Sequence, residues 1–386
     1  MSGSIDGISA EDLEDQMSTY RDCSTGLSRR EAVRLLGAGA AAGIVAGLHP
    51  DLAFAAQAGG RRGSRVSFPK GAIIRTILKD VPPDALGGGA TLFHEHISIA
   101  DPLPSWLPPP KTPRPPLGSD INLMVEELKA TARDGVSCIV NAGTKDLGQN
   151  IEHLRAIATR SGMHIVVAGG YHTQPRYPPQ VATQTDDQIA EDFLRDAAAE
   201  RWGALGEIGS SMTMHPDERK VLRACCKVHL RTGLPLFTHT PHEGCRSCGL
   251  EQLDIIEAAG VNPRLVAIGH LADITDDPKA ETHKALAKRG AFLGFDTVGR
   301  RITQPDSKKL EMLLAVLDAG YEDHLMLSSD FASPDELKAN HGVGLGSAFV
   351  NFVPKMRYAG VKEDIIRKIT VDNPRRFLAF VPKTST

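Results

Sequence analysis

Histidines and carboxylates suited to metal binding stand at the ends of five short apolar segments of this 386-residue chain. His94 and His96 form an H-x-H pair, which alternation along a strand places on one side while Glu95 points away. The other four candidates each end a later apolar segment: Glu207, His239, His270 and Asp330. Imidazole and carboxylate ligands favour zinc, manganese, iron or cobalt over calcium or magnesium. We therefore expect these six side chains to bind two divalent transition-metal ions, with zinc preferred.

A single buried histidine at a strand end is more often a hydrogen-bonded core residue than a metal ligand. The joint placement of six such residues at one end of one fold argues against that alternative. Elsewhere, His215, His229 and His283 fall on predicted helices or loops away from this end, and we expect them at the surface. His242 follows in a loop that can line the pocket, and we leave it outside the ligand set.

Short runs of Val, Ile and Leu alternate with longer amphipathic stretches along the chain, as parallel strands alternate with crossover helices. The apolar runs end at Phe93, Val140, Ala168, Leu205, Phe237, Ile268, Phe295 and Leu327. Helical patterns cover residues 121–133, 151–159, 189–199, 218–232, 250–259, 279–288 and 308–317. Eight such units predict a (β/α)8 TIM barrel better than an open sheet, with the active site at the C-terminal ends of the strands.

The predicted barrel extends over residues 69–386, after a linker at 56–68. Its last segment, 363–380, has the pattern of a closing helix. A Pro-rich loop at 101–118, which contains Trp106, follows the first strand. A loop of this length is more often a wall beside the substrate than a linker.

Charge and composition limit the class of partner. Lys and Arg number 44 against 47 Asp and Glu, which gives a net charge of -3, and aromatic residues make up only 5%. No basic surplus or stacking platform is available for nucleic acid, so a small-molecule substrate is expected. The apolar segment 35–48 is shorter than the ~20 residues of a membrane-spanning helix, so no stable span is expected. The sequence is compatible with either a homodimer or a monomer.

The first 55 residues have the order of a bacterial export signal. Arg29 and Arg30 precede the weakly apolar segment 35–48, and an A-x-A cleavage pattern follows at 53–55. This order resembles a twin-arginine signal peptide, with Ala32 where such signals usually carry Phe. An amphipathic surface helix is the alternative. The resemblance implies a periplasmic or extracellular protein.

Six cysteines are present, and Cys23 would be lost with the signal. The remaining five do not make an even disulfide framework. Cys245 and Cys248 form a C-x-x-C pair without a partner pair at zinc-finger spacing. A disulfide after export is an alternative, but we expect two free thiols.

The chain resembles the phosphotriesterase family of the amidohydrolase superfamily from residue 66 to residue 382. The resemblance includes the branch named for phosphotriesterase homology proteins. It rests on several motifs in order along the chain: residues 81–87, 91–96, 203–211, 237–240, 269–273, 295–300, 327–330 and 372–377. A series of separate motifs is far more specific than an isolated H-x-H.

The resemblance implies a division of the six ligands between two ions. His94, His96 and Asp330 would hold the more buried ion, and His239 and His270 the more exposed one. Many members bridge the ions with a carboxylated lysine, whereas the equivalent residue here is Glu207. The chain therefore resembles the branch with a glutamate bridge, and this departure argues against phosphotriesterase activity, which belongs chiefly to lysine-bridged members.

The implied reaction is hydrolysis by a metal-bridged hydroxide of a carboxylic ester, lactone or amide. Asp330 would accept the proton of that water, and Asp273 would relay it. Helix capping is the alternative role for Asp273. Tyr171 and Arg300 are placed to contact substrate, or else to pack within loops.

Two other functions stay open. One is hydrolysis of organophosphate triesters, as in an aryldialkylphosphatase. The other is a non-catalytic barrel that binds small lipophilic molecules, which predicts the loss of a metal ligand. The sequence retains all six candidates.

Overall fold

A computed structural model of the chain describes residues 66–99, 115–300 and 302–383. The predicted signal peptide lies outside these residues, as do residues 56–65 of the linker and residues 101–114 of the Pro-rich loop with Trp106.

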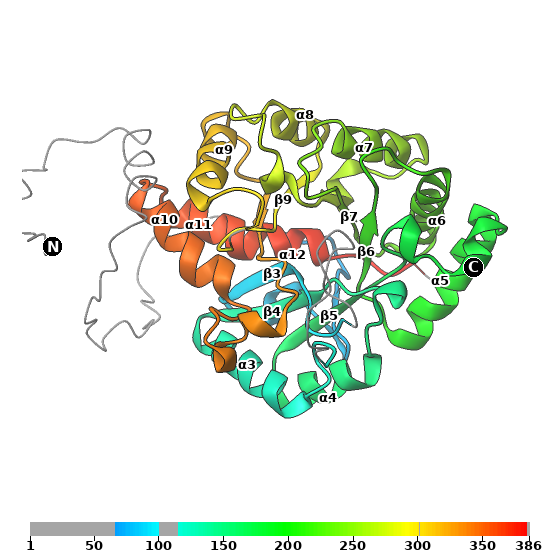
Figure 1. The fold of residues 1–386 in the computed structure, drawn as a ribbon, viewed down its shortest axis with the longest axis horizontal. Helices are drawn as coiled ribbons and strands as arrows, with labels where there is room; N and C mark the ends of the chain where they lie inside the picture. The colour runs from blue at the N-terminus through cyan, green and yellow to red at the C-terminus, as the bar shows by residue number, and fades with distance from the viewer. Residues whose placement is uncertain (1–65, 100–114, 301, 384–386) are drawn as a thin grey trace, which may run out of the picture. The chain divides into compact units, whose positions relative to one another are not determined.

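The described chain forms the predicted (β/α)8 barrel (Figure 1). Its eight strands pair in parallel in the order of the sequence. The strands are β3 (Ala90–Glu95), β4 (Val136–Asn141), β5 (His164–Gly169), β6 (Ala204–Gly209), β7 (Leu236–His239), β8 (Val266–Ile268), β9 (Phe292–Phe295) and β10 (Leu325–Leu327). The ring closes just beyond β10, where Asp330 N–H donates to His94 O at 3.2 Å and His96 N–H donates to Phe331 O at 2.8 Å.

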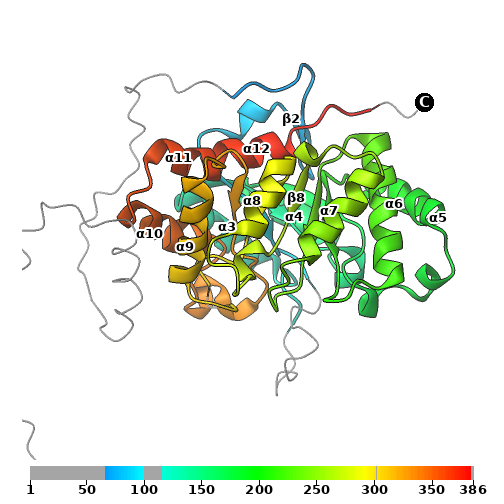
Figure 2. The same cartoon turned by 90° about the horizontal axis from the view of Figure 1, so that it is seen from above.

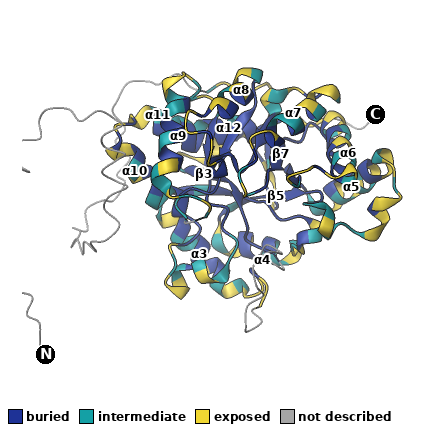
Figure 3. Ribbon diagram, turned by 45° about the horizontal axis from the view of Figure 1, so that its top comes forward, coloured by how far each residue is buried: buried dark blue, intermediate teal, exposed yellow. Residues whose placement is uncertain are grey.

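Helices cover the outside of the strands, and their exposed faces form the outer surface (Figure 3). Their apolar faces are buried because apolar residues recur at helical spacing, as Met124, Val125 and Leu128 do in α3. The helices are α3 (Ile121–Arg133), α4 (Ile151–Ser161), α5 (Asp186–Glu200), α6 (Pro216–Thr232), α7 (Cys248–Ala258), α8 (Glu281–Arg289), α9 (Asp306–Asp318), α10 (Val353–Tyr358), α11 (Glu363–Arg367) and α12 (Asn373–Leu378). None of the helices in the described ranges is long and apolar enough to cross a membrane.

An aromatic cluster fills the N-terminal end of the barrel. The ring of Phe377, from α12, packs edge-on against Phe93, Phe237 and Phe292 at centroid distances of 6.4, 6.4 and 5.8 Å. A hairpin of β1 (Ile74–Arg75) and β2 (Asp80–Val81) lies at the same end as α12 (Figure 2). We call these four phenylalanines the aromatic plug.

The predicted closing helix forms over residues 363–378, but it is not α-helical throughout. α11 and α12 are joined by a π-helical turn at Lys368–Asp372, so the helical segment over 363–378 contains one wider turn.

Three buried glutamates fasten the loops at the C-terminal end of the barrel to backbone N–H groups. Glu95 accepts from Ser329 and Phe331 at 2.7 Å each, as expected for a side chain that points away from the H-x-H pair. Glu127 accepts from Lys338 at 2.9 Å and from Leu345 at 3.1 Å. A third glutamate, Glu218, accepts from Gln174, Ser211 and His215. Loop backbone that is bonded in this way is held at many points.

Cys245 and Cys248 form a disulfide, so the expectation of two free thiols is wrong. The turn that leads into α7 brings their Cα atoms to 5.4 Å, within the normal span of a disulfide.

The surface assignment of three histidines is correct only for His215, which is exposed and caps α6 by accepting from Asp217 N–H. His229 and His283 are buried. Each is bonded to a backbone carbonyl, His229 Nδ1 to Leu234 O at 2.6 Å and His283 Nε2 to Leu271 O at 2.9 Å. A histidine on an otherwise apolar helix face can be buried when a carbonyl accepts its N–H, and spacing does not reveal that carbonyl.

Candidate metal centre

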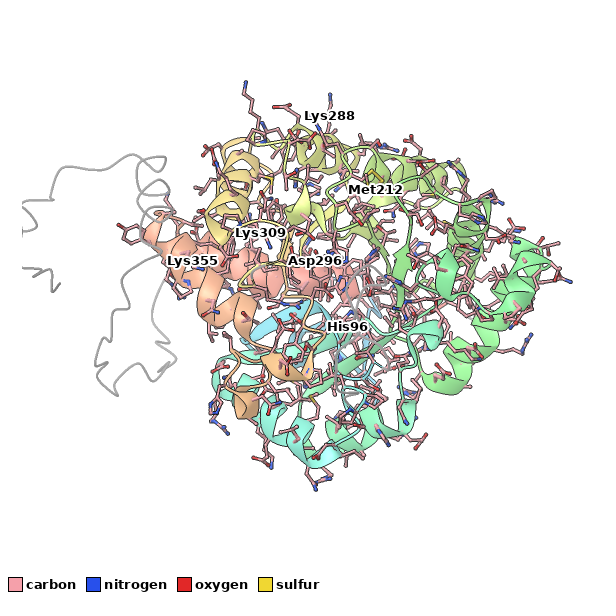
Figure 4. The ribbon with its side chains drawn as sticks, in the orientation of Figure 1. His96, Met212, Lys288, Asp296, Lys309 and Lys355 are labelled. Carbon is pink, nitrogen blue, oxygen red and sulfur yellow. A yellow bond between two sulfur atoms is a disulfide. The ribbon has the colours of Figure 1, made fainter. Side chains whose placement is uncertain are left out.

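The structure brings the six predicted residues together at the C-terminal end of the barrel. They come from β3, β6 and β7 and from the residues that follow β3, β8 and β10: His94, His96, Glu207, His239, His270 and Asp330. All six side chains are buried, as is usual for ligands held on rigid strands. Figure 4 shows His96 near the centre of the ring of strands, and Lys288 at the rim of the molecule.

Glu207 lies at the centre of this cluster. Its Oε1 is 3.3 Å from His96 Nε2. Its Oε2 is 3.3 Å from His94 Nε2, 2.9 Å from His239 Nδ1 and 3.6 Å from His270 Nε2. The two oxygens of one carboxylate therefore contact both sets of histidines, the arrangement that a bridging ligand needs.

A glycine before Glu207 allows the strand to place it there. Gly206 has φ of 146°, a conformation that L side chains rarely adopt. A Cβ at this position would lie 2.5 Å from the ring of Phe237. Only glycine fits between Phe237 and the bend that leads into Glu207.

Asp296, which follows β9, orients two of the histidines, although no role for it was predicted from the sequence. Its Oδ2 is 2.9 Å from His94 Nδ1 and its Oδ1 is 3.2 Å from His270 Nδ1. With Nδ1 of each ring hydrogen-bonded to Asp296, each Nε2 faces the centre of the cluster. Carboxylates that hold the far nitrogen of a ligating histidine are a recurrent feature of metal sites.

The cluster holds buried carboxylates, from Glu207, Asp296 and Asp330, in contact with buried imidazoles. Burial alone would lower the pKa of His94, but Glu207 and Asp296 raise it to about 10. Burial would raise the pKa values of Asp330 and Glu207, but the neighbouring histidines hold both below their usual range. The carboxylates thus stabilise positive charge on the imidazoles, and divalent cations meet the same demand.

The donor atoms fit a pair of transition-metal ions. His94 Nε2 is buried and makes no hydrogen bond within the described ranges, although it lies 3.3 Å from Glu207 Oε2 and 3.7 Å from Asp330 Oδ1. His94, His96 and Asp330 offer ligand atoms within 4.8 Å of one another. Near Glu207 Oε2, His270 Nε2 and His239 Nδ1 face each other at 2.7 Å. A buried imidazole nitrogen without a partner, beside carboxylates, is what a nitrogen- and oxygen-binding cation requires.

His242, which we left outside the ligand set, lies within the cluster. Its Nδ1 is 2.7 Å from Asp273 Oδ2, and its Nε2 is 3.6 Å from Asp330 Oδ2. Asp273 also accepts from the hydroxyl of Thr297 at 2.7 Å and lies 3.8 Å from the buried Lys309 Nζ. A loop histidine therefore connects the two aspartates that the sequence singled out.

The alternative role of Asp273 as a helix cap is not what the structure shows. Asp277 instead accepts from the first backbone N–H groups of α8, those of Glu281 and Thr282. Asp273 contacts side chains of other loops, so its position serves the cluster end of the barrel.

Tyr171 is buried and packs against Phe193 of α5 and Tyr177, with ring centroids 4.9 and 5.8 Å apart. These are the contacts of a packing residue, and its role as a substrate contact stays a prediction. The next residue, His172, faces the cluster, with Nε2 3.7 Å from Glu207 Oε2.

Arg300 lies beside the cluster and is mostly buried. Its Nη1 donates to Ser329 O at 2.9 Å and lies 3.9 Å from Asp330 Oδ2. Its Nε and Nη2 form a two-bond pair with Glu336 at 2.6 and 3.0 Å. The guanidinium therefore joins two loops at the rim, close enough to Asp330 to border a bound substrate.

Proteins with similar sequences carry several hydrolase names. The phosphotriesterase homology protein of Escherichia coli is 29% identical over 259 residues, which is 65% of this chain and 87% of that protein. The aryldialkylphosphatase of Saccharolobus solfataricus is 28% identical, over 75% of this chain and 95% of that protein. The N-acetyltaurine hydrolase of Danio rerio is 25% identical, over 80% of this chain and 98% of that protein.

Solved structures agree with the barrel. A resiniferatoxin-binding protein from Rhodobacter sphaeroides superposes with a TM-score of 0.73 and 27% identity, over 81% of this chain and 96% of that one. A lactonase from Listeria monocytogenes gives a TM-score of 0.69 and 25% identity, over 80% of this chain and 99% of that one.

The fold and the cluster define a (β/α)8 barrel with grouped histidines and carboxylates at the C-terminal ends of its strands. The chain belongs to the phosphotriesterase family, whose model matches residues 74–378. It is a hydrolase of that family, as the names of its relatives support.

Proposed function

We propose that the chain binds two divalent transition-metal ions, with zinc preferred and manganese, cobalt or iron as alternatives, and hydrolyses a carboxylic ester, lactone or amide. The placement of Glu207 is the observation that carries this proposal. One of its oxygens faces His96, and the other faces His94, His239 and His270. A pair of bound ions supplies an activated water and polarises the bond to be cleaved.

The residues of the chain have separate tasks around that chemistry. Asp330 contacts His96 at 3.2 Å and His242 at 3.6 Å, so its carboxylate lies between the cluster and the loop after β7. A proton accepted at Asp330 has a short path through His242 to the buried carboxylate of Asp273. Asp296 keeps its two histidines oriented, and the exclusion of bulk water by burial strengthens each of these interactions.

A carbonyl substrate is preferred over a phosphotriester because a glutamate occupies the bridging position. The lactonase and the N-acetyltaurine hydrolase, both similar over at least 80% of this chain, carry names that fit cleavage at a carbonyl. Esters, lactones and amides all present a carbonyl carbon to the attacking water, so they form one candidate class.

Organophosphate triester hydrolysis is the second candidate. The aryldialkylphosphatase relative favours it, at 28% identity over 95% of that protein. The chemistry that bound ions would supply suits attack at either phosphorus or carbon, so the substrate-binding loops would decide between the two substrate classes.

The test is a substrate screen with metal-loaded protein. The full chain is stripped with a chelator, reloaded separately with zinc, manganese, cobalt or iron, and analysed for metal content. We expect about two ions per chain. Lactones, aryl esters, N-acyl amides and aryl dialkyl phosphates are then compared by kcat/KM. Turnover that is highest for a carbonyl substrate, and lost on chelation, supports the first candidate. A highest value for the phosphate supports the second, and one ion or fewer after reloading contradicts the binuclear centre.

We also propose that the chain is exported by the twin-arginine route, because Arg29 and Arg30 precede the mild apolar segment 35–48. Replacement of both arginines by lysine should leave unprocessed precursor in a bacterial cytoplasm. Fractionation and immunoblotting measure this, and normal export of the double variant would contradict the proposal.

A further inference from the structure

His172 is a histidine beside the cluster for which no role was predicted from the sequence. It follows β5, and its backbone is fixed on both sides. Its N–H donates to the carboxylate of Asp146 at 2.9 Å, and its C=O accepts from Gly209 N–H, at the end of β6, at 2.7 Å. The loop therefore holds this residue as firmly as a strand end does.

The imidazole of His172 lies beside Glu207 and His239. Its Nε2 is 3.7 Å from Glu207 Oε2, and its ring lies edge-on to that of His239 with centroids 4.4 Å apart. The side chain is 14% exposed, whereas that of His94 is fully buried. Its place beside His239 is on the half of the centre that we assign to the more exposed ion.

Three potential ligand atoms converge at this point. Those of His172, Glu207 and His239 lie within 4.8 Å of one another. Nδ1 of His172 is 3.1 Å from the hydroxyl of Thr173. When Nδ1 donates to that hydroxyl, Nε2 presents its lone pair towards Glu207 and His239.

His242 also lies beside His239, with ring centroids 5.4 Å apart, but its partners differ from those of His172. Its Nδ1 is paired with Asp273 at 2.7 Å, and its Nε2 faces Asp330. Its two nitrogens therefore connect two carboxylates. Nε2 of His172 instead faces the carboxylate that would bridge the ions.

Resting on the binuclear centre proposed above, we propose that His172 supplies a further imidazole to the more exposed metal site, with Glu207, His239 and His270. That site then has three imidazoles and one carboxylate. The more buried site has two imidazoles and two carboxylates, from His94, His96, Asp330 and the shared Glu207. Imidazole suits zinc and cobalt, whereas oxygen ligands suit manganese. The exposed site therefore prefers zinc over manganese more strongly than the buried site does.

The experiment measures metal affinity in the full chain, independently of turnover. Stripped wild type, His172→Gln and His172→Ala are titrated with Zn²⁺ and with Mn²⁺ against a chromophoric chelator. We expect one of the two Zn²⁺ sites to weaken about 10- to 100-fold in both variants, with a smaller change for Mn²⁺ and with the other site unchanged. The visible absorption of the Co²⁺-loaded protein should also change, because one nitrogen ligand is lost. Thr173→Val, which removes the hydroxyl beside Nδ1, should weaken the same site several-fold.

His164→Gln is the matched control, because it changes the histidine at the start of β5, the strand that leads to His172, at the opposite end of the barrel. It should retain both affinities, and circular dichroism checks that all variants fold. If folded His172→Gln binds two Zn²⁺ ions with the affinities of the wild type, the proposal is overturned. This holds also if the KM of the variant rises, because His172 then contacts substrate and not metal. Fewer than two ions in wild type overturn the binuclear centre and this proposal together. Two ions in wild type without hydrolysis of any substrate contradict the proposed function alone.

Discussion

The two ends of the barrel are built from the same strands but from opposite kinds of side chain. On β3, Phe93 belongs to the aromatic plug, and the next residue, His94, is bonded to Asp296. On β7, the ring of Phe237 packs against both Phe93 and His94, at centroid distances of 6.4 and 5.5 Å. The boundary between an apolar core and a charged cluster is therefore one side chain thick.

The difference between the two ends indicates that the aromatic plug stabilises the fold and that the cluster of histidines and carboxylates serves the chemistry. Burial of the four phenylalanines removes apolar surface from water and stabilises the fold. Burial of Glu207, Asp296 and Asp330 costs free energy that hydrogen bonds and positive charge must offset. Substitutions at one end should therefore reduce stability, and substitutions at the other should reduce metal binding and turnover.

The largest effect is expected at Glu207. Glu207→Gln keeps the size of the side chain but removes the negative charge that offsets the repulsion between two bound cations. At least one ion should therefore bind more weakly, and hydrolysis should fall about 1,000-fold or more. Metal content and rate are measured together. Glu200→Gln, which changes a carboxylate bonded to Trp202, is the control.

A charged bridge can also be restored in another form. Glu207→Lys should regain part of its activity in bicarbonate, because a carboxylated lysine ends in a similar carboxylate. Two tightly held ions and a near-wild-type rate in Glu207→Gln would remove Glu207 from the bridging role.

The aromatic plug gives the opposite result. Phe377→Ala removes a ring that contacts three others, and should lower the free energy of unfolding by about 3–5 kcal/mol. Metal stoichiometry of the folded protein should be unchanged. Urea denaturation and metal analysis test this, and a loss of metal at full stability would show that the two ends are not separable.

Asp296 tests the boundary between the ends. Asp296→Asn keeps the shape but removes the charge beside His94 and His270, so metal affinity should fall about 10- to 100-fold. Stability of the metal-free protein should fall less than in Phe377→Ala. Chelator competition and urea denaturation measure the two quantities, and unchanged affinity would contradict an orienting role.

Buried histidines outside the cluster should affect stability alone. Burial lowers the pKa of His283 to about 4, against an ordinary value of 6.5. As the pH falls from 7 to 5, the unfolded chain gains a proton at this site and the folded chain does not, so the free energy of unfolding should drop by about 1 to 2 kcal/mol. His283→Gln should show a shallower loss in denaturation curves at the two pH values, whereas the exposed His341→Asn should match wild type.

The barrel could be predicted from sequence because its signal is repeated eight times. Each buried strand is short and apolar, and α3 begins and ends at the predicted residues. The π-helical turn at Lys368–Asp372 could not be predicted, because it changes hydrogen bonding without changing the helical pattern of apolar residues.

The residues of the candidate site could be predicted where they stand directly at the C-terminal end of a strand. Alternation failed at β5, because Gly170, with φ of 133°, breaks the strand before Tyr171 and His172. Beyond this break, the alternation of side chains along the strand no longer predicts whether Tyr171 or His172 faces the inside of the barrel. His242 lies in a loop, whose direction depends on its bond to Asp273. Asp296 stands at a strand end, and this position could have revealed it.

The long loop after β10, residues 328–347, is fastened along its whole length. Glu95 holds its beginning, the ion pair between Arg300 and Glu336 holds its middle, and Glu127 holds two points beyond. Such a loop opens only when several bonds break together, so its amide hydrogens should exchange slowly and as one unit. A ligand that binds against this wall spends little free energy on ordering it, and selection among ligands then depends on shape rather than on closure.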